Sequence, residues 1–259
     1  MTYLGHGNPT VLAHESMFLV SRDLNAVQNG GRLPFFYTAA SQVGVFDDPA
    51  RISMPEALLK KTDGGVIGMI SATRVGYHNS NMVLANQFHE QMYASKREHV
   101  PVGLALMEAK QMALSLFGPT DLAFRNMQRY SLFGDPATRL ALPRYRVQIE
   151  VADSLSALGE VSVSGRILDP AGDFAASYQG QVWLQAFDSS VRSRLDGFSY
   201  QQVGAHMFRG RVAVVDGRFA TAFRVPKDIT YGGRNGRVSA YAWSDAQPAA
   251  YGSVGGLVL

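Results

Sequence analysis

Apolar residues follow two different patterns along the chain, and the pattern changes near residue 143. Before this point, continuous apolar runs at 34–40 and 66–73 are typical of buried strands. They alternate with longer segments, 79–96 and 100–118, whose apolar residues recur with helical spacing. This alternation predicts an α/β fold with a mostly parallel sheet and helices on both of its faces.

From Tyr145 onward, short segments alternate apolar and polar residues, as half-buried strands do. These segments are 146–152, 160–168, 180–188, 207–225 and 236–244. Asp216-Gly217 interrupts the fourth segment and predicts a hairpin turn. Several strands at this spacing predict an all-β, immunoglobulin-like sandwich. We therefore expect two domains, residues 1–143 and residues 144–259.

Local signals place the ends of some elements. Ser53, Pro55 and Glu56 supply the cap, the early proline and the acidic first turn of a helix, and Gly64-Gly65 follows it. The stretch RYSLFGDPATRLALP, residues 129–143, is expected to be a turn and exit segment that ends the first domain.

Composition and charge limit the classes of function that the chain can have. The chain has 259 residues, of which 46% are hydrophobic, so it can bury a sizeable core. Its formal net charge of +3 is small and its arginines are scattered along the sequence, which argues against nucleic-acid binding. No apolar run approaches the roughly 20 residues of a membrane helix, and the first residues lack the pattern of a signal peptide. The absence of cysteine excludes disulfides but does not decide the compartment.

Reactive side chains follow two of the predicted strands. His6 stands between Gly5 and Gly7 after an apolar pair, and Ser41 follows the run 34–40. If the two strands are parallel neighbours, both side chains emerge at the carboxyl edge of the sheet, where open α/β sheets place their sites. A base beside a nucleophile is the minimum arrangement for covalent acyl chemistry. The alternative is a turn that carries an incidental imidazole.

Longer blocks carry a family resemblance. The Gly-His-Gly strand end, PTVLAHE, PFFYTAA and VFDDP resemble the gingipain-type cysteine peptidases. Three further blocks resemble, within that family, the cell-surface sortases of the type IX secretion system: DDPARISMPEALLKKTDGGVIGMISATR, YSLFGDPATRLALP and RFATAFRVPKDITYGGRNGRVSAYAW. The resemblance implies a caspase-like fold, with residues 1–143 as the carboxyl half of the peptidase domain. It also implies that the chain is a piece of a longer protein, which has a region before His6 and a continuation past Leu259.

The resemblance assigns roles to three residues and shows one departure. His6 corresponds to the base, Ser41 falls at the position of the nucleophilic cysteine, and the amides of Gly7 and Ser41 correspond to the oxyanion hole. A cysteine is partly ionised near neutral pH, whereas a serine hydroxyl is not and needs a well-aligned base. A site shaped for sulfur therefore predicts an inactive or very weak peptidase. A working serine enzyme and a serine introduced to trap an inactive protein are the open alternatives.

Three more residues are expected to border the substrate cleft: Glu15, Ser71 and Thr73. The alternative for His14-Glu15 is an ordinary loop, and the alternative for Ser71 and Thr73 is an ordinary strand exit. Asp47-Asp48 is more typical of a turn with solvated charges than of a cation site, because a hard metal needs several oxygen ligands. We expect no cofactor and no metal site, and structural calcium stays open as an alternative that the sequence does not indicate.

Two further histidines and both tryptophans are expected to have no role in the site. His78 and His89 have no metal-ligand spacing, and a structural or surface position is expected for both. Trp183 and Trp243 lie in strand patterns and are expected in the core of the second domain.

The expected activity, by resemblance, is that of a surface sortase that removes the carboxy-terminal signal of secreted cargo and passes the acyl group to a surface glycolipid. The expected partners are such cargo proteins and outer-membrane secretion components, and the expected location is the outer face of the outer membrane. Ser41 also motivates a second hypothesis, a catalytically silent scaffold that binds cargo or a secretion partner without cutting. A purely structural surface protein is a third, which leaves the glycine-flanked histidine unexplained.

Overall fold

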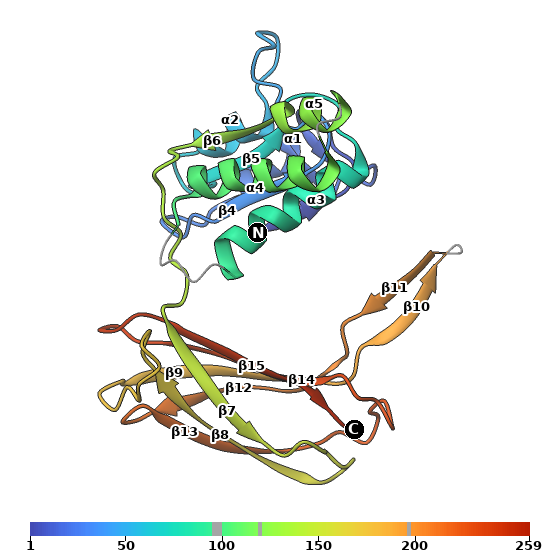
Figure 1. Cartoon of the computed structure of the whole chain (residues 1–259). Helices are drawn as coiled ribbons and strands as arrows, with labels where there is room; N and C mark the ends of the chain where they lie inside the picture. Colours follow the sequence, from blue (N-terminus) through green and yellow to red (C-terminus); the bar gives the residue numbers. More distant parts are fainter. Residues whose placement is uncertain (95–99, 119–120, 196–197) are drawn as a thin grey trace. The chain divides into compact units, whose positions relative to one another are not determined.

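The computed structural model describes residues 1–94, 100–118, 121–195 and 198–259. These residues form two units, Met1–Ala141 and Leu142–Leu259, each with its own sheet (Figure 1). The division lies within two residues of the change in hydrophobic pattern near residue 143.

The first unit is built on a four-stranded sheet in the order β1-β4-β5-β6. Its strands are β1 (Thr2–Leu4), β4 (Phe35–Ala39), β5 (Gly68–Ala72) and β6 (Tyr130–Gly134). β1, β4 and β5 are parallel, whereas β6 runs antiparallel to β5, so the sheet is mixed. The prediction of a turn and exit segment at 129–143 is confirmed for residues 135–143, which are turn and irregular chain, and is wrong for β6. β6 pairs with β5, and its Tyr130 is buried with its ring stacked on that of Tyr37.

Helices cover both faces of this sheet (Figure 1). On one face, Phe35 and Tyr37 of β4 stack against Phe88 of α3 (His78–His89), and α4 (Val102–Phe117) and α5 (Asp121–Arg129) pack beside α3. On the other face, α2 (Met54–Leu59) packs against the alternate side chains of the same strands. This second core contains Phe36, Ala40, Val43, Met54, Leu58 and Met69.

The predicted cap at Ser53 is confirmed. The Glu56 carboxylate accepts hydrogen bonds from the N–H and Oγ of Ser53, which closes the first turn of α2. The helix predicted over 79–96 begins one residue earlier, as α3, and continues as a π-helical turn over Glu90–Ala94. Residues 95 and 96 of that prediction lie outside the described residues.

Several short elements of the first unit had no clear sequence pattern. They are the hairpin of β2 (Val11–Leu12) and β3 (Phe18–Leu19), α1 (Val20–Asp23) and the 3₁₀ turn η1 (Leu24–Ala26). Elements of two to four residues are too short to show a hydrophobic period. α5 is different, because its nine residues are amphipathic with helical spacing, and the sequence analysis did not identify it.

The second unit contains a seven-stranded sheet in the order β12-β9-β14-β15-β7-β8-β13. Its strands are β7 (Tyr145–Val151), β8 (Glu160–Leu168), β9 (Gly180–Phe187), β12 (His206–Val214), β13 (Arg218–Arg224), β14 (Gly236–Trp243) and β15 (Ala250–Leu257). β15 and β7 pair in parallel at only two residue positions, so the sheet divides into two layers. One layer is β12-β9-β14-β15 and the other is β7-β8-β13, a sandwich that nearly closes into a barrel.

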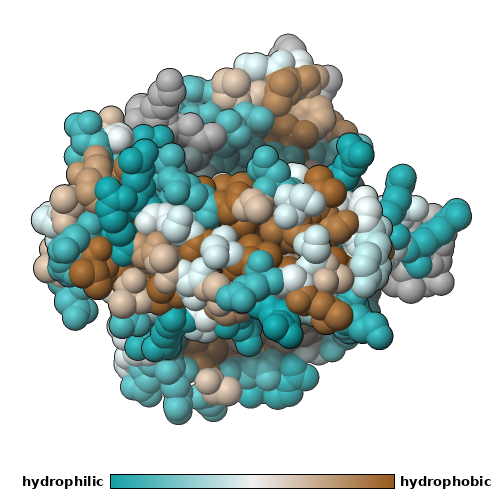
Figure 2. All heavy atoms as spheres, turned by 90° about the horizontal axis from the view of Figure 1, so that it is seen from below, coloured by the Kyte–Doolittle hydropathy of each residue, from teal (hydrophilic) through white to brown (hydrophobic). Residues whose placement is uncertain are grey.

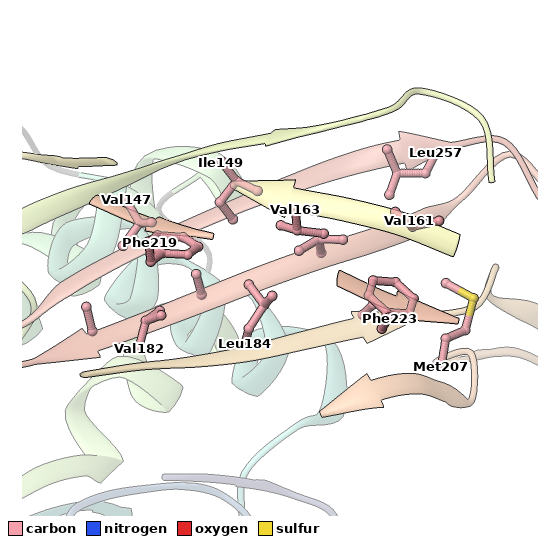
Figure 3. Close-up of a cluster of buried hydrophobic side chains, with 14 of the residues drawn as sticks. Val147, Ile149, Val161, Val163, Val182, Leu184, Met207, Phe219, Phe223 and Leu257 are labelled. Atoms are coloured by element: carbon pink, nitrogen blue, oxygen red, sulfur yellow. The ribbon is translucent and has the colours of Figure 1, made fainter. Parts of the chain in front are cut away.

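The core of this unit lies between the two layers (Figure 3). Val147, Val163 and Phe219 come from one layer and meet Val182 and Leu184 of the other. Their alternation with exposed polar residues is the pattern from which these strands were predicted.

The predicted hairpin turn at Asp216-Gly217 is confirmed. Both residues have positive φ, and Val215 and Arg218 on either side exchange two backbone hydrogen bonds of 2.9 Å as an antiparallel bridge. The pairing does not extend further, because β12 then pairs with β9 and β13 with β8.

One prediction for the second unit needs correction. Trp183 and Trp243 are not in the core. They lie on the outer side of their layer because the alternate residues, Val182 and Ala242, are the ones that face inward.

Two elements of this unit were not predicted: β15, and a separate hairpin of β10 (Val191–Leu195) and β11 (Phe198–Gln202). The hairpin extends away from the main sheet of its unit (Figure 1).

Elsewhere on the molecule, hydrophobic residues reach the surface among hydrophilic ones, as one face shows in Figure 2. Within the described residues, no helix has the length and apolar character needed to cross a membrane.

Candidate active site

The ends of β1 and β4 place His6 and Ser41 at one edge of the first sheet. The two strands are parallel neighbours, with Leu4 paired to Ala39. Beyond this pair, the Gly5 N–H donates to the Ala39 carbonyl at 3.4 Å. The segments that carry His6 and Ser41 therefore leave the sheet together at its carboxyl edge, as expected for parallel strands.

Gly7 has an amide that points toward the Ser41 side. The Ala13 N–H donates to the His6 carbonyl at 2.9 Å, and the Asn8 N–H donates to the Val11 carbonyl at 3.0 Å. These two bonds join His6 and Asn8 to β2 and to Ala13, the residue that follows it. Because N–H directions alternate along extended chain, the Gly7 N–H points the other way, as the Gly5 N–H does.

Gly7 also lies against the turn that carries Ser41. A Cβ atom on Gly7 would come within 2.7 Å of Val43 Cγ2 and 3.2 Å of Ala40 Cβ. Val43 and Ala40 are completely buried and cannot easily give way. The close packing of the Val43 and Ala40 side chains against Gly7 therefore leaves no room for a side chain at this position.

The Ser41 side chain is held by the loop that follows β5. Its Oγ accepts a hydrogen bond from the Gly76 N–H at 3.1 Å and lies 3.5 Å from the Gly76 carbonyl. The next residue, Gln42, has a φ of +60°, which is unusual for a residue other than glycine, and its N–H donates to the Arg74 carbonyl. The turn at position 41 and the exit of β5 thus form one hydrogen-bonded unit.

Buried asparagines anchor the other side of this loop. Asn126 Oδ1 accepts from the Tyr77 N–H at 3.1 Å, and Asn126 Nδ2 donates to Asn81 Oδ1 at 3.1 Å. Asn126 has no exposed surface. The Arg129 guanidinium donates to the Val75 carbonyl and lies over the Tyr77 ring. The position of Gly76, and through it of Ser41, therefore depends on α3 and α5.

His6 is exposed and lies beside a second histidine. The ring centroids of His6 and His14 are 5.3 Å apart, and the Tyr3 hydroxyl donates to the His6 carbonyl at 2.6 Å. Among the described residues, the His6 ring makes no hydrogen bond and has no carboxylate partner. His6 is therefore available as a base, without an orienting acid in this part of the chain.

The three residues expected at the cleft have different positions. Glu15 is exposed in the turn between β2 and β3, next to His14. Ser71 is completely buried, and its hydroxyl pairs with that of Thr38 at 2.7 Å, so it joins β5 to β4 and has no surface toward a substrate. Thr73 donates through its N–H and Oγ1 to the Arg129 carbonyl, so it anchors the β5 exit.

Charged pairs and a small cavity surround the site. The Arg74 guanidinium hydrogen-bonds Asp47 and lowers the pKa of that carboxyl, and Arg51 pairs with Asp48 at 3.0 Å. A cavity of about 330 Å³ lies where the two strand-end segments meet. Its lining residues are Asn8, Pro9, Thr10, Gln42, Val45, Asp48 and Arg51. Within the described ranges, no three His, Asp or Glu side chains are grouped to hold a metal.

Sequence reasoning missed Gly76 and Asn126 as neighbours of the site. They act through contacts between residues far apart in the chain, for which the sequence carries no local signal. The sequence makes the pair His14-Glu15 a candidate for the substrate cleft, with an ordinary loop as the alternative, and the structure places the His14 ring beside that of His6.

Comparison of the chain with models of protein families shows the family to which it belongs. The family model of peptidase family C25 matches residues 1–141, which is more than half of the 259 residues. The chain belongs to peptidase family C25. The matched region contains every candidate site residue and the whole first unit.

Three solved structures are similar to the chain. A crystal structure of dimeric latent PorU from Porphyromonas gingivalis is 26% identical, with a TM-score of 0.43, over 76% of this chain and 20% of that one. The Arg-specific cysteine proteinase gingipain R (RgpB) is 16% identical, with a TM-score of 0.50, over 98% of this chain and 52% of that one. A complex of Porphyromonas gingivalis RgpB pro- and mature domains is 17% identical, with a TM-score of 0.50, over 98% and 53%.

The likeness to RgpB shows that nearly all of this chain shares the gingipain fold. The chain spans about a fifth of the PorU structure and about half of each gingipain structure. A search of curated proteins by sequence gave no match.

Proposed function

We propose that the first unit of this C25 chain carries an acyl-transfer site in which serine stands at the nucleophile position. The observation that carries the proposal is the parallel pairing of β1 with β4, which brings His6, Gly7 and Ser41 to one sheet edge. A base, a nucleophile and backbone donors are then available in one place.

The chemistry of such a site follows from these atoms. Ser41 Oγ would attack the carbonyl carbon of a peptide bond, and its proton would pass to the His6 imidazole. The carbonyl π electrons move to oxygen, and the amides of Gly7 and Ser41 would stabilise that oxyanion. The C–N bond then breaks, the amine leaves with the proton from His6, and the acyl group remains on Ser41 until an acceptor nucleophile takes it.

The natural chain is proposed to perform this reaction slowly or not at all. Ser41 Oγ is bound by the Gly76 loop, and His6 has no orienting acid within the described residues. A serine hydroxyl has a very high pKa and depends on an aligned base, whereas a thiolate does not. Misplacement of the base by about 1 Å costs roughly 10²-fold in rate.

The proposed biological reaction is sorting of secreted cargo at the cell surface. It would remove the carboxy-terminal signal of cargo and transfer the acyl group to a surface glycolipid, in contact with outer-membrane secretion components. The support for this is the resemblance of three long sequence blocks, from Asp47 to Trp243, to the sortases of type IX secretion.

A silent scaffold is the second candidate. The Gly76–Ser41 hydrogen bond favours it, because this bond keeps the hydroxyl in the wall of the site without any reaction. Such a protein would bind the cargo signal through the same sheet edge and release it uncut.

The deciding experiment incubates the full chain with a peptide that carries a cargo carboxy-terminal signal and follows products by mass spectrometry. Four forms are compared: the natural chain, Ser41→Ala, Ser41→Cys, and Ser41→Cys with His6→Ala. Cleavage by Ser41→Cys alone supports a silenced peptidase site. Cleavage by the natural chain that Ser41→Ala abolishes identifies a serine enzyme. Peptide binding without cleavage by any form favours the scaffold.

A further inference from the structure

One layer of the second unit presents an unusual row of side chains on its outer side. The strand registers place Arg211 of β12 opposite Trp183 of β9, Trp183 opposite Tyr241 of β14, and Tyr241 opposite Tyr251 of β15. Tyr241 and Tyr251 are 42% and 50% exposed. We call this surface the arginine–aromatic face. It consists of Arg209, Arg211, Gln181, Trp183, Gln185, Phe187, Arg237, Ser239, Tyr241, Trp243, Tyr251 and Ser253.

Arginines lie on the rings of this face. The Arg211 guanidinium carbon is 5.7 Å from the ring centroid of Trp183 and 5.9 Å from that of Trp243. Arg209 lies 6.0 Å from Trp183, and Arg237 lies 4.6 Å from Phe187. Cation–π contacts of this kind hold the long arginine side chains in place before any partner arrives.

The positive charge of these arginines is not compensated on the face. Arg209, Arg211 and Arg237 have no carboxylate partner within the described part of the chain. None of the residues that define the face is acidic. Asp188, which follows β9, is buried and its carboxylate is already bound by Thr230. Three fixed cations without anions are complementary to a negatively charged partner.

The geometry also discriminates between classes of partner. Nucleic-acid bases bind such surfaces by stacking on free ring faces, and sugars need free rings in the same way. Here guanidinium groups already lie over Trp183, Trp243 and Phe187. Besides the partly exposed rings of Tyr241 and Tyr251, the face offers the fork of N–H donors on each arginine, which matches a carboxylate in bidentate fashion.

The size of the face fits one extended segment of chain. Four strands about 4.8 Å apart, with about seven residues of roughly 3.3 Å each, give an area of roughly 350 Å². A standard protein–protein interface buries about 800 Å² on each partner, so the face alone is too small for a folded domain. Tyrosine, tryptophan and arginine are the residues that contribute most to binding polypeptides.

We propose that the arginine–aromatic face binds an acidic polypeptide segment, with side-chain carboxylates on Arg209, Arg211 and Arg237. The glutamines and serines between the rings would hydrogen-bond the main chain of that segment. A surface depression of about 510 Å³, lined in part by Gln181, Trp243 and the acidic Asp245, adjoins the face at one end. The strand registers place Arg209 and Arg237 toward the other end of β9, opposite Gln185 and Phe187, and the carboxylates of the segment are expected there. This proposal concerns the second unit alone and does not depend on peptidase activity.

The test uses an unusual property of the chain. Its only two tryptophans, Trp183 and Trp243, both lie on the arginine–aromatic face, so tryptophan emission reports binding there. The full chain is titrated with a fluorescein-labelled peptide of ten glutamates, and peptide anisotropy and tryptophan emission are recorded together. We expect saturable binding with a parallel change in emission, weakened by added salt.

Variants separate the face from a general effect of charge. Arg211→Ala and Arg237→Ala are expected to weaken binding about tenfold each, and Arg211→Lys to weaken it less because it keeps the charge but loses the planar fork. The matched control is Arg218→Ala on β13, because Arg218 also stacks on a ring, that of Phe174, but lies outside the face. The Arg218→Ala variant is expected to bind the glutamate peptide with the same affinity as the natural chain.

Three results would overturn the proposal. The first is the absence of glutamate-peptide binding at millimolar concentration. The second is an equal loss of affinity in Arg218→Ala, which would mean that net charge alone attracts the peptide. The third is equal or tighter binding of an oligothymidylate or a sulfated polysaccharide, which would assign the face to nucleic acid or glycan instead.

Discussion

The N–H of Gly76 donates a hydrogen bond to Ser41 Oγ over 3.1 Å. This contact ties the side chain at the nucleophile position to the loop after β5. The donated N–H draws electron density from the oxygen, so it opposes attack by a neutral hydroxyl. The same N–H would stabilise a thiolate, because a hydrogen bond to the charged form of a group lowers its pKa. The Gly76 N–H therefore suits a sulfur anion at position 41, whereas the Gly76 carbonyl, 3.5 Å from Ser41 Oγ, suits the hydroxyl that is present.

The buried asparagine behind this loop should control its position. Asn126→Ala removes the acceptor for the Tyr77 N–H and the donor to Asn81, and leaves both groups without their partner. We expect a loss of about 2–3 kcal/mol in the free energy of unfolding, measured by urea denaturation. Asn79→Ala, at an exposed position of α3, is the control and should change stability by less than about 0.5 kcal/mol. Equal stability of the two variants would contradict the anchoring role of Asn126.

Gly7 should not accept a side chain. Gly7→Ala introduces a Cβ within 2.7 Å of Val43 Cγ2, and overpacking of a close contact of this kind costs about 1–3 kcal/mol. Gly31→Ala is the control, because a Cβ there meets no atom within 4 Å. Thermal unfolding of the two variants measures the difference. In the Ser41→Cys background, Gly7→Ala should also reduce cleavage, since it displaces the amide that we propose as an oxyanion donor.

Removal of the Tyr37 hydroxyl should not destabilise the chain. This hydroxyl is buried and has no hydrogen-bond partner within the described residues, and burial raises the pKa of Tyr37 well above its usual value. We expect Tyr37→Phe to leave the free energy of unfolding unchanged or to raise it by up to about 1 kcal/mol. Tyr3→Phe is the comparison, because the Tyr3 hydroxyl donates to the His6 carbonyl, and its loss should cost about 1 kcal/mol. A larger loss for Tyr37→Phe than for Tyr3→Phe would contradict this account.

The hydrogen bonds between Ser53 and Glu56 at the start of α2 should make the free energy of unfolding depend on pH in the acid range. Hydrogen bonds from Ser53 lower the pKa of Glu56 below its ordinary value of 4.5, so the folded chain binds fewer protons there than the unfolded chain. The contribution of Glu56 is therefore complete above about pH 4.5 and is lost as the pH falls through the folded pKa. In thermal unfolding from pH 7 to pH 3, Glu56→Gln should lose less stability than the natural chain. Glu160→Gln, at an exposed position of β8, should follow the natural chain.

The meeting of His6 and Ser41 at the carboxyl edge of the first sheet could be predicted, because it depends on local sequence patterns. Two continuous apolar runs identified β4 and β5, and the Gly-His-Gly triplet identified the end of β1. Parallel pairing then places His6 and Ser41 at one edge without any further information. β6 was missed because its residues alternate only weakly, and what makes it a strand is pairing with β5 and the stack of Tyr130 on Tyr37.

The contacts that complete the site could not be predicted. Gly76 lies 35 residues from Ser41, and Asn126 lies 49 residues from Tyr77, so both contacts depend on the packing of helices against the sheet. The position of Trp183 was mispredicted for a different reason. Val182, Leu184 and Ala186 form the more apolar set of β9, and this alternation already indicates that Trp183 faces outward. The arginines of the arginine–aromatic face are scattered in the sequence and are gathered only by strand register.

The most direct test of the central claim measures the thiol at position 41. The chain contains no cysteine, so Ser41→Cys creates a single thiol whose alkylation rate can be followed from pH 5 to pH 10. If His6 and the Gly76 N–H act on position 41, the rate should rise with a midpoint well below the ordinary cysteine pKa of about 8.5. His6→Ala in the same background should move the midpoint upward. A midpoint near 8.5 in both variants would contradict the claim that His6 and position 41 form a catalytic pair.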